Sequence, residues 1–190
     1  MNNYEYIIAS LPVIDQENKE IDTDVLLSQI REQCSGSDLQ VLDQLLDGYR
    51  DEKLDEEFYR KAFSSRSRYI RRFFEFDLNV RNAKVRYLNK ALGRPESKDI
   101  IDISTGEFRE LTTVNDILVG NDLLARERAL DDMMWKKIEE ITEMEIFSLD
   151  RILGLVSKIK IIDRWVKLDE QTGRELFRKM VKEIKDTYTI

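Results

Sequence analysis

The chain has 190 residues, of which 42% are hydrophobic and 36% charged, and its formal net charge is −7. Seven glycines and two prolines are too few for the many turns of a β-sandwich or barrel, whereas the abundance of Leu, Ile, Glu, Lys and Arg favours helices. We therefore predict one all-α domain over residues 1–190, a multi-helix bundle organised around one long central helix.

Several kinds of chemistry are missing from the sequence. It contains no histidine, which argues against ordinary hydrolases, and Cys34 is its only cysteine, which excludes an internal disulfide. Neither the Gly-x-x-x-x-Gly-Lys-Ser/Thr loop nor Gly-x-Gly-x-x-Gly is present. We expect no catalytic residue, no cofactor and no metal site, and therefore a protein that is not an enzyme.

No apolar run approaches the ~18 residues that a membrane span needs, and the N-terminus does not have the pattern of a signal peptide. We expect a cytoplasmic protein without a membrane span, which reaches a membrane only through a partner.

The first third of the chain predicts short helices. Residues 4–11 form an apolar run before Pro12, and they suit either an extended segment or a short helix, buried in both cases. A helix follows over about 24–34, capped by Asp22 or Thr23. Ser37 is the expected cap of the next helix, which presents leucines on one face and stops at Gly48.

Residues 58–92 contain neither glycine nor proline and predict one long helix, with Asp55 as its N-cap and Gly93 just past its end. At about 100° per residue, two apolar stripes lie on nearly opposite faces, so other helices should pack on both sides. The first stripe contains Phe58, Ala62, Ser65, Tyr69, Phe73, Phe76, Val80, Ala83, Tyr87 and Ala91, and the second contains Ile70, Phe74, Leu78, Val85 and Leu88.

A basic strip runs between the two stripes and should reach solvent or a partner. Its members are Lys61, Arg68, Arg72, Asn79, Asn82, Arg86 and Lys90. Residues 60–94 hold eleven basic side chains and two acids, so this segment carries +9 and the remainder of the chain −16. The acids of the chain itself can neutralise most of this charge, or an acidic partner can bind it. The candidate partner-binding residues are Lys61, Arg68, Arg72, Arg86 and Lys90.

Asp77 lies between the apolar stripes, and Arg81 follows one turn later. One interpretation is an exposed ion pair contributing ~0.3 to 0.5 kcal/mol. The other is a partly buried polar anchor that fixes how neighbouring helices pack.

The second half of the chain predicts three more helices, over about 121–145, 148–167 and 169–187, the middle one central because it has little polar surface. Between the long helix and these, residues 100–108 suit a small hairpin or a turn.

Three segments resemble a known family. The opening Tyr4-Glu5-Tyr6-Ile7-Ile8-Ala9-Ser10-Leu11-Pro12 resembles the "YYYLVASLP"-like start of an uncharacterised bacterial family encoded beside V-type ATPase (ATP synthase) subunits and related to their C/d subunit. Residues 76–84 are similar to an Asp-x-x-Asn pattern on long helices of that subunit, although Asp77 and Asn79 stand two apart and Asn82 fits a longer spacing. Residues 149–182 resemble its C-terminal helices.

This resemblance implies a non-catalytic adaptor at the central stalk of a proton-transporting rotary ATPase. Its partners would be other V-type ATPase subunits, on the side of the rotor shaft and of the membrane ring. The protein would be peripheral to the membrane through that complex. The alternative is a helical nucleic-acid-binding protein that uses the basic 60–94 segment, with arginines for phosphates and aromatic rings for stacking. The net negative charge of the protein and the expected burial of those rings argue against binding of nucleic acid.

Overall fold

A computed structural model describes residues 4–16, 21–103 and 105–168. Within these ranges the chain forms eight α-helices, one 3-10 turn and no strand, which confirms the all-α prediction. The helices are α1 (Tyr4–Ser10), α2 (Thr23–Gln33), α3 (Gly36–Asp47), α4 (Glu56–Phe63), α5 (Arg68–Ala91), α6 (Leu111–Val119), α7 (Leu123–Thr142) and α8 (Leu149–Lys167). The helix predicted over 169–187 lies outside the described residues.

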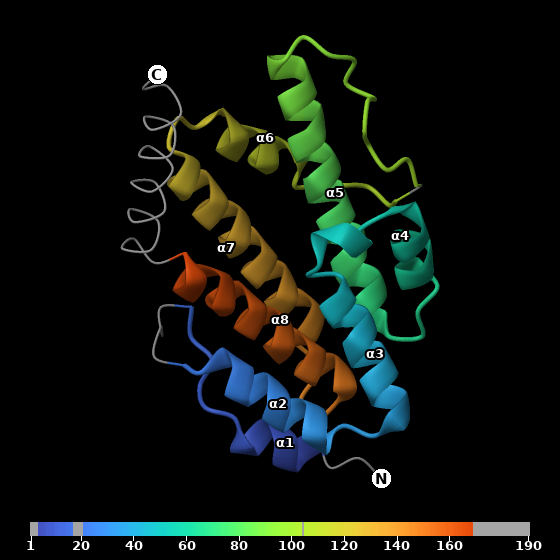
Figure 1. Cartoon of the computed structure of the whole chain (residues 1–190), viewed down its shortest axis with the longest axis vertical. Helices are drawn as coiled ribbons and strands as arrows, with labels where there is room; N and C mark the ends of the chain where they lie inside the picture. The colour runs from blue at the N-terminus through green and yellow to red at the C-terminus, as the bar shows by residue number, and fades with distance from the viewer. Residues whose placement is uncertain (1–3, 17–20, 104, 169–190) are drawn as a thin grey trace, which may run out of the picture.

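The helices are arranged around α5, α7 and α8 (Figure 1). α7 and α8 form an antiparallel pair, α1 and α2 pack on α8, and α4 packs on the first half of α5. α6 bridges α5 and α7 near the opposite end. Across the described ranges, no helix combines the length and the apolar character that crossing a bilayer would require.

The prediction of one helix over 58–92 is wrong, because α4 and α5 are separate helices joined by residues 64–67. Ser67 has an extended backbone and its hydroxyl accepts a 3.2 Å hydrogen bond from the Ile70 amide, so α5 starts there. The Ser64 hydroxyl donates to the Arg60 carbonyl at 3.0 Å. Serine side chains offer the backbone such alternatives to helical bonding. The apolar spacing continues across the break because both helices face the same core.

Two hydrophobic clusters bury α5, but they do not correspond to its two stripes, since residues of both stripes meet in the larger cluster. The larger cluster holds Tyr69, Phe74 and Leu78 together with side chains of α1 to α4, α7 and α8. The smaller cluster lies between α5, α6 and α7 and contains Phe76 and Val80. α8 is central as predicted, and Ile152, Leu153, Val156 and Ile159 are fully buried.

Several helix ends agree with the predictions and others differ. Asp22 and Asp55 cap α2 and α4, and Gly48 ends α3. Gly93 follows α5 with a φ of +64°, a left-handed conformation that glycine adopts without a Cβ clash. Ser35, not Ser37, precedes α3, so Ser37 lies inside the helix. The segment 4–10 is helical, yet only Ile7 is buried, because α1 lies on the outside of α8.

Residues 100–103, 105 and 106 form no hairpin. They have neither helix nor strand structure, and Ile101, Thr105 and Gly106 bond to polar side chains of α5. The Asn82 amide donates to the Ile101 carbonyl at 2.9 Å and accepts from the Ile101 amide at 3.1 Å. The Thr105 hydroxyl donates to Asn79 at 2.9 Å. After this segment the chain enters α6, which the sequence did not predict as a helix.

Candidate functional site

The five candidate residues of the basic strip do not lie together. Lys61 is on α4, beside a depression that α3 also lines. Arg68 and Arg72 are near the start of α5, and Arg86 and Lys90 are near its end. Fourteen positions separate Arg72 from Arg86, about 21 Å along a helix. All five are exposed, as predicted for a strip that reaches solvent, but the strip is interrupted, because Asn82 in its middle is buried and bonds to Ile101.

Arg68 and Arg72 lie against the end of α7. The Arg68 guanidinium donates to the Ile141 carbonyl at 3.0 Å and pairs with Glu145 at 3.2 Å. Arg72 is exposed and borders a depression that Glu140 and Ile141 also line. Cations near the last turn of a helix are favourable because its carbonyls carry partial negative charge. Arg68 is therefore held at this place on the surface, and Arg72 follows one turn later on α5.

The loop between α7 and α8 exposes three large apolar side chains beside these arginines. Met144 is 85% exposed, Ile146 68% and Phe147 54%. Single exposed apolar residues are common, whereas three within four positions concentrate apolar surface in one loop, and such a concentration is typical of interaction sites. We call Arg68, Arg72, Met144, Ile146 and Phe147 the loop surface.

The loop surface is fixed to the rest of the fold. Asp150, in the first turn of α8, accepts hydrogen bonds from the Ser67 hydroxyl at 2.8 Å and from the Tyr69 amide at 3.2 Å. Ser148 caps α8 through the Arg151 amide. These bonds connect the start of α8, just after the exposed loop, to the start of α5. The sequence analysis missed this loop by extending the preceding helix to 145.

Asp77 and Arg81 form an ion pair that a third residue completes. The Asp77 carboxylate accepts hydrogen bonds from the Arg81 Nε at 2.8 Å and from the Tyr59 hydroxyl at 2.6 Å. Tyr59 is fully buried on α4, and burial, followed by the charge of Asp77, raises the pKa of its hydroxyl. The carboxylate therefore joins α4 to α5.

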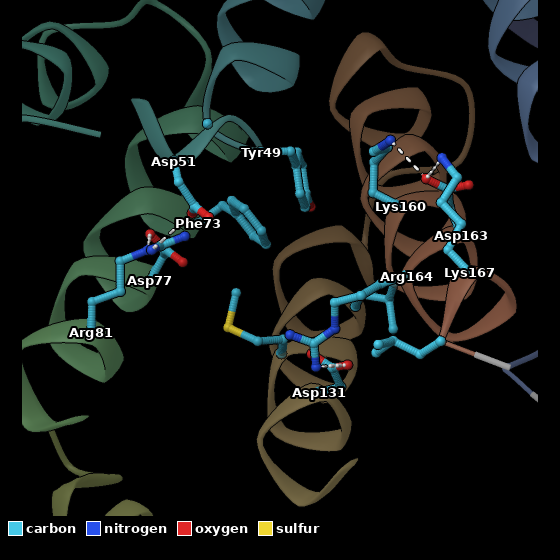
Figure 2. A pocket seen from close by; sticks show the side chains of 14 residues that line it. Tyr49, Asp51, Phe73, Asp77, Arg81, Asp131, Lys160, Asp163, Arg164 and Lys167 are labelled. Atoms are coloured by element: carbon cyan, nitrogen blue, oxygen red, sulfur yellow. Dashed lines mark hydrogen bonds and ion pairs between the residues drawn. The ribbon is translucent and has the colours of Figure 1, made fainter. Parts of the chain in front are cut away.

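The same pair lines a pocket of about 610 Å³ between α5, α7, α8 and the residues that follow α3 (Figure 2). Apolar parts of Tyr49, Phe73, Met134 and Ile161 form its interior. The charged side chains around it are Asp51, Asp77, Arg81, Asp131, Lys160, Asp163, Arg164 and Lys167. No group of three or more metal-ligating side chains that could hold an ion occurs in the part of the chain that the structure describes.

Three of the four carboxylates in this pocket are less exposed than the cations that they pair with, and Asp51 is the exception. The side chains of Asp77, Asp131 and Asp163 are only 8–14% exposed, whereas the basic side chains paired with them are 22–64% exposed. The carboxylates are also occupied as acceptors. Asp131 accepts from Arg164 and from the Trp165 indole, and Asp163 accepts from Thr23, Lys160 and Lys167.

Burial and pairing shift the pKa values of two of these acids in opposite directions. Burial raises the pKa of Asp131, and the opposing effect of Arg164 and Trp165 does not overcome it. Burial alone would also raise the pKa of Asp163, but the hydrogen bonds from Lys167, Lys160 and Thr23 outweigh it and lower the pKa. Asp163 is thus the acid that folding favours in its ionised form.

The fold and these sites define an all-helical protein with an exposed apolar loop and a charged pocket. Residues 48–188 match the family described as "Protein of unknown function (DUF2764)", and the chain belongs to that family. The match covers α4 to α8, the loop surface and the pocket. Neither a curated protein nor a solved structure matches the chain.

Proposed function

We propose that the protein is a non-catalytic helical adaptor that binds a subunit of a V-type ATPase through the loop surface. The resemblance of residues 4–12 supports the choice of complex. The observation that carries the proposal is the position of Met144, Ile146 and Phe147, exposed beside Arg68 and Arg72.

The loop surface suits an acidic amphipathic segment of a partner subunit. Covering exposed apolar side chains contributes about 25 cal/mol for each Å² removed from water. The adjacent arginines meet acidic groups on the partner, which speeds association and fixes its orientation. Because the loop is tied to α5 and α8, little conformational entropy is lost on binding.

Nucleic acid is the weaker alternative. The rings that would stack on bases include Tyr69, Phe73 and Phe74, and all three are at most 2% exposed. Stacking needs accessible ring faces. Phosphate contacts from Arg86 and Lys90 would have to act without stacking from these three rings.

Affinity purification of the tagged full chain from its native organism tests the proposal. We expect V-type ATPase subunits in the eluate of the wild type and their loss from R68Q/R72Q. The matched control is R86Q/K90Q, which removes the same charge from the other end of α5 and should keep the partner. An eluate that repeatedly lacks these subunits, or one whose 260 nm absorbance nuclease removes, would overturn the proposal.

A further inference from the structure

We propose that the pocket between α5, α7 and α8 is a binding site for a small organic anion with an aromatic or aliphatic body. This inference does not depend on the partner of the loop surface. Ligand pockets are commonly 300–1,000 Å³ in volume, with apolar walls and a few polar groups that fix orientation. The volume of about 610 Å³ lies within that range, and Tyr49, Phe73, Met134 and Ile161 supply the apolar walls.

The charge of the ligand follows from the depth of the charged groups. A molecule that enters the pocket reaches Arg81, Lys160, Arg164 and Lys167 before Asp77, Asp131 and Asp163, because these three carboxylates are the less exposed members of their ion pairs. Asp51 is the exception, since its side chain is 98% exposed. Asp77 and Asp131 each already accept two hydrogen bonds, and Asp163 accepts three. A cationic ligand would have to displace these donors, whereas an anion can add to the outer nitrogens.

One cation at the edge of the pocket has donors that are not fully used. Arg81 bonds Asp77 through Nε, and its Nη1 atom is 4.0 Å from Asp51, which is almost fully exposed. Such an exposed, long pair contributes little. The Tyr49 hydroxyl is closed off from solvent, so Tyr49 contributes only its ring to the pocket wall.

The pocket therefore suits a ligand that has an apolar part and an anionic part. Its apolar body lies against Phe73 and Met134, and its anionic group lies toward Arg81, Lys160 and Arg164, which Figure 2 shows around one opening. A carboxylate or a sulfonate satisfies this requirement equally, since both present several acceptor oxygens to cationic donors.

Two fluorescent probes that differ in one group test the inference on the full chain. 8-Anilinonaphthalene-1-sulfonate carries an aromatic body and an anion, and N-phenyl-1-naphthylamine carries the same body without the charge. We expect saturable binding of the sulfonate at one site, weakened by about two- to fivefold in K160Q at low ionic strength and less at high salt. The neutral probe should bind K160Q as it binds the wild type. K160Q keeps Asp163 paired, because Lys167 and Thr23 remain.

Further variants show whether the probe binds in the pocket or on another surface. M134W fills the pocket and should abolish binding of the sulfonate, with circular dichroism as the check on folding. K136Q removes an exposed charge from α7 outside the pocket, and F147S alters the loop surface; both should bind like the wild type. Absence of saturable binding to the wild type, equal binding to K160Q, or loss of binding in F147S would overturn the inference. Loss in F147S would place the probe on the loop surface, so this outcome is distinct from failure of the adaptor proposal.

Discussion

The hydroxyl of Tyr59 donates a 2.6 Å hydrogen bond to the carboxylate of Asp77, across the break between α4 and α5. Tyr59 is fully buried, and Asp77 simultaneously holds Arg81 at the edge of the pocket. One carboxylate therefore sets the packing of two helices and the position of a pocket cation. Its role exceeds that of an exposed ion pair, because a buried donor depends on it.

Removing the Tyr59 hydroxyl should destabilise the fold. In Tyr59→Phe, Asp77 keeps Arg81 but loses its bond from α4, and a hydrogen bond to a charged group contributes about 1.5 to 3 kcal/mol. We expect a loss of this size in the free energy of unfolding, measured by urea titration with Trp135 and Trp165 as fluorophores. Tyr87→Phe is the control, since no bond of its hydroxyl occurs among the described residues. Equal stability of Tyr59→Phe and the wild type would contradict the anchoring role.

Asp163 should make stability depend on acid pH. Its folded-state pKa lies below the ordinary value of 3.8, so the stabilisation is present above that pH and is lost as the pH falls through the lowered pKa. Asp163→Asn should lower the free energy of unfolding by about 2 kcal/mol at pH 7. The difference from the wild type should shrink below pH 4. Asp116→Asn, at an exposed position on α6, should show no such convergence. A constant difference across the pH range would rule out this linkage.

Gly48 should tolerate no side chain. A Cβ there would clash with the ring of Phe74, which is buried against Phe58. Gly48→Ala should therefore destabilise the protein by about 1 to 3 kcal/mol, the usual cost of overpacking. Gly36→Ala offers a matched control in the same helix, since nothing lies within 4 Å of its Cβ position. Thermal unfolding of both variants gives the comparison, and similar melting temperatures would show that Phe74 moves away without cost.

Two buried phenylalanines of the first stripe of α5 should cause large losses of stability on truncation. Phe73 and Phe76 are 2% and 5% exposed and belong to different clusters. Phe73→Ala and Phe76→Ala should each cost ~3 to 5 kcal/mol. Leu92→Ala, at an exposed position just past the helix, is the control. A loss below about 1 kcal/mol in both phenylalanine variants would be incompatible with the packing that the structure shows.

Sequence periodicity predicted the helices well and their interruption poorly. Ala62, Ser65 and Tyr69 keep helical spacing across residues 64–67, because α4 and α5 bury the same side of the core. Only the run of serines hints at the break, since serine caps helices as often as it continues them. The caps Asp22 and Asp55 were predictable because each bonds an amide only three residues away.

The sites depend on contacts that are distant in the sequence. The position of Asp77 between the stripes marked it as a candidate anchor. Its hydrogen-bond donor Tyr59 could not be predicted, because Tyr59 lies on another helix. The pocket requires α5 to face α7 and α8, which no local pattern encodes. The two hydrogen bonds between Asn82 and Ile101 could not be predicted from local sequence either. The exposed loop carried one usable signal: Ser148 caps α8, so Met144, Ile146 and Phe147 lie before the start of that helix.

The charges of the loop surface should serve binding more than folding. The variant R68Q/R72Q should unfold within about 1 kcal/mol of the wild type, because exposed ion pairs contribute little. Its affinity for the partner should fall, most visibly at low ionic strength, where steering charges act strongly. Urea titration and the salt dependence of partner binding measure the two effects. Unfolding of this variant, together with salt-independent binding of the wild type, would mean that the arginines serve the fold.

The most direct measurement is photo-crosslinking from the loop surface in the native organism. A photoreactive phenylalanine analogue replaces Phe147 in one variant and Val119 in the other. Both positions are exposed: Phe147 lies in the loop between α7 and α8, and Val119, 67% exposed, is the last residue of α6. The account predicts a crosslinked V-type ATPase subunit from position 147 and none from position 119. Crosslinks to that subunit from position 119 alone, or no ATPase subunit from position 147, would contradict it.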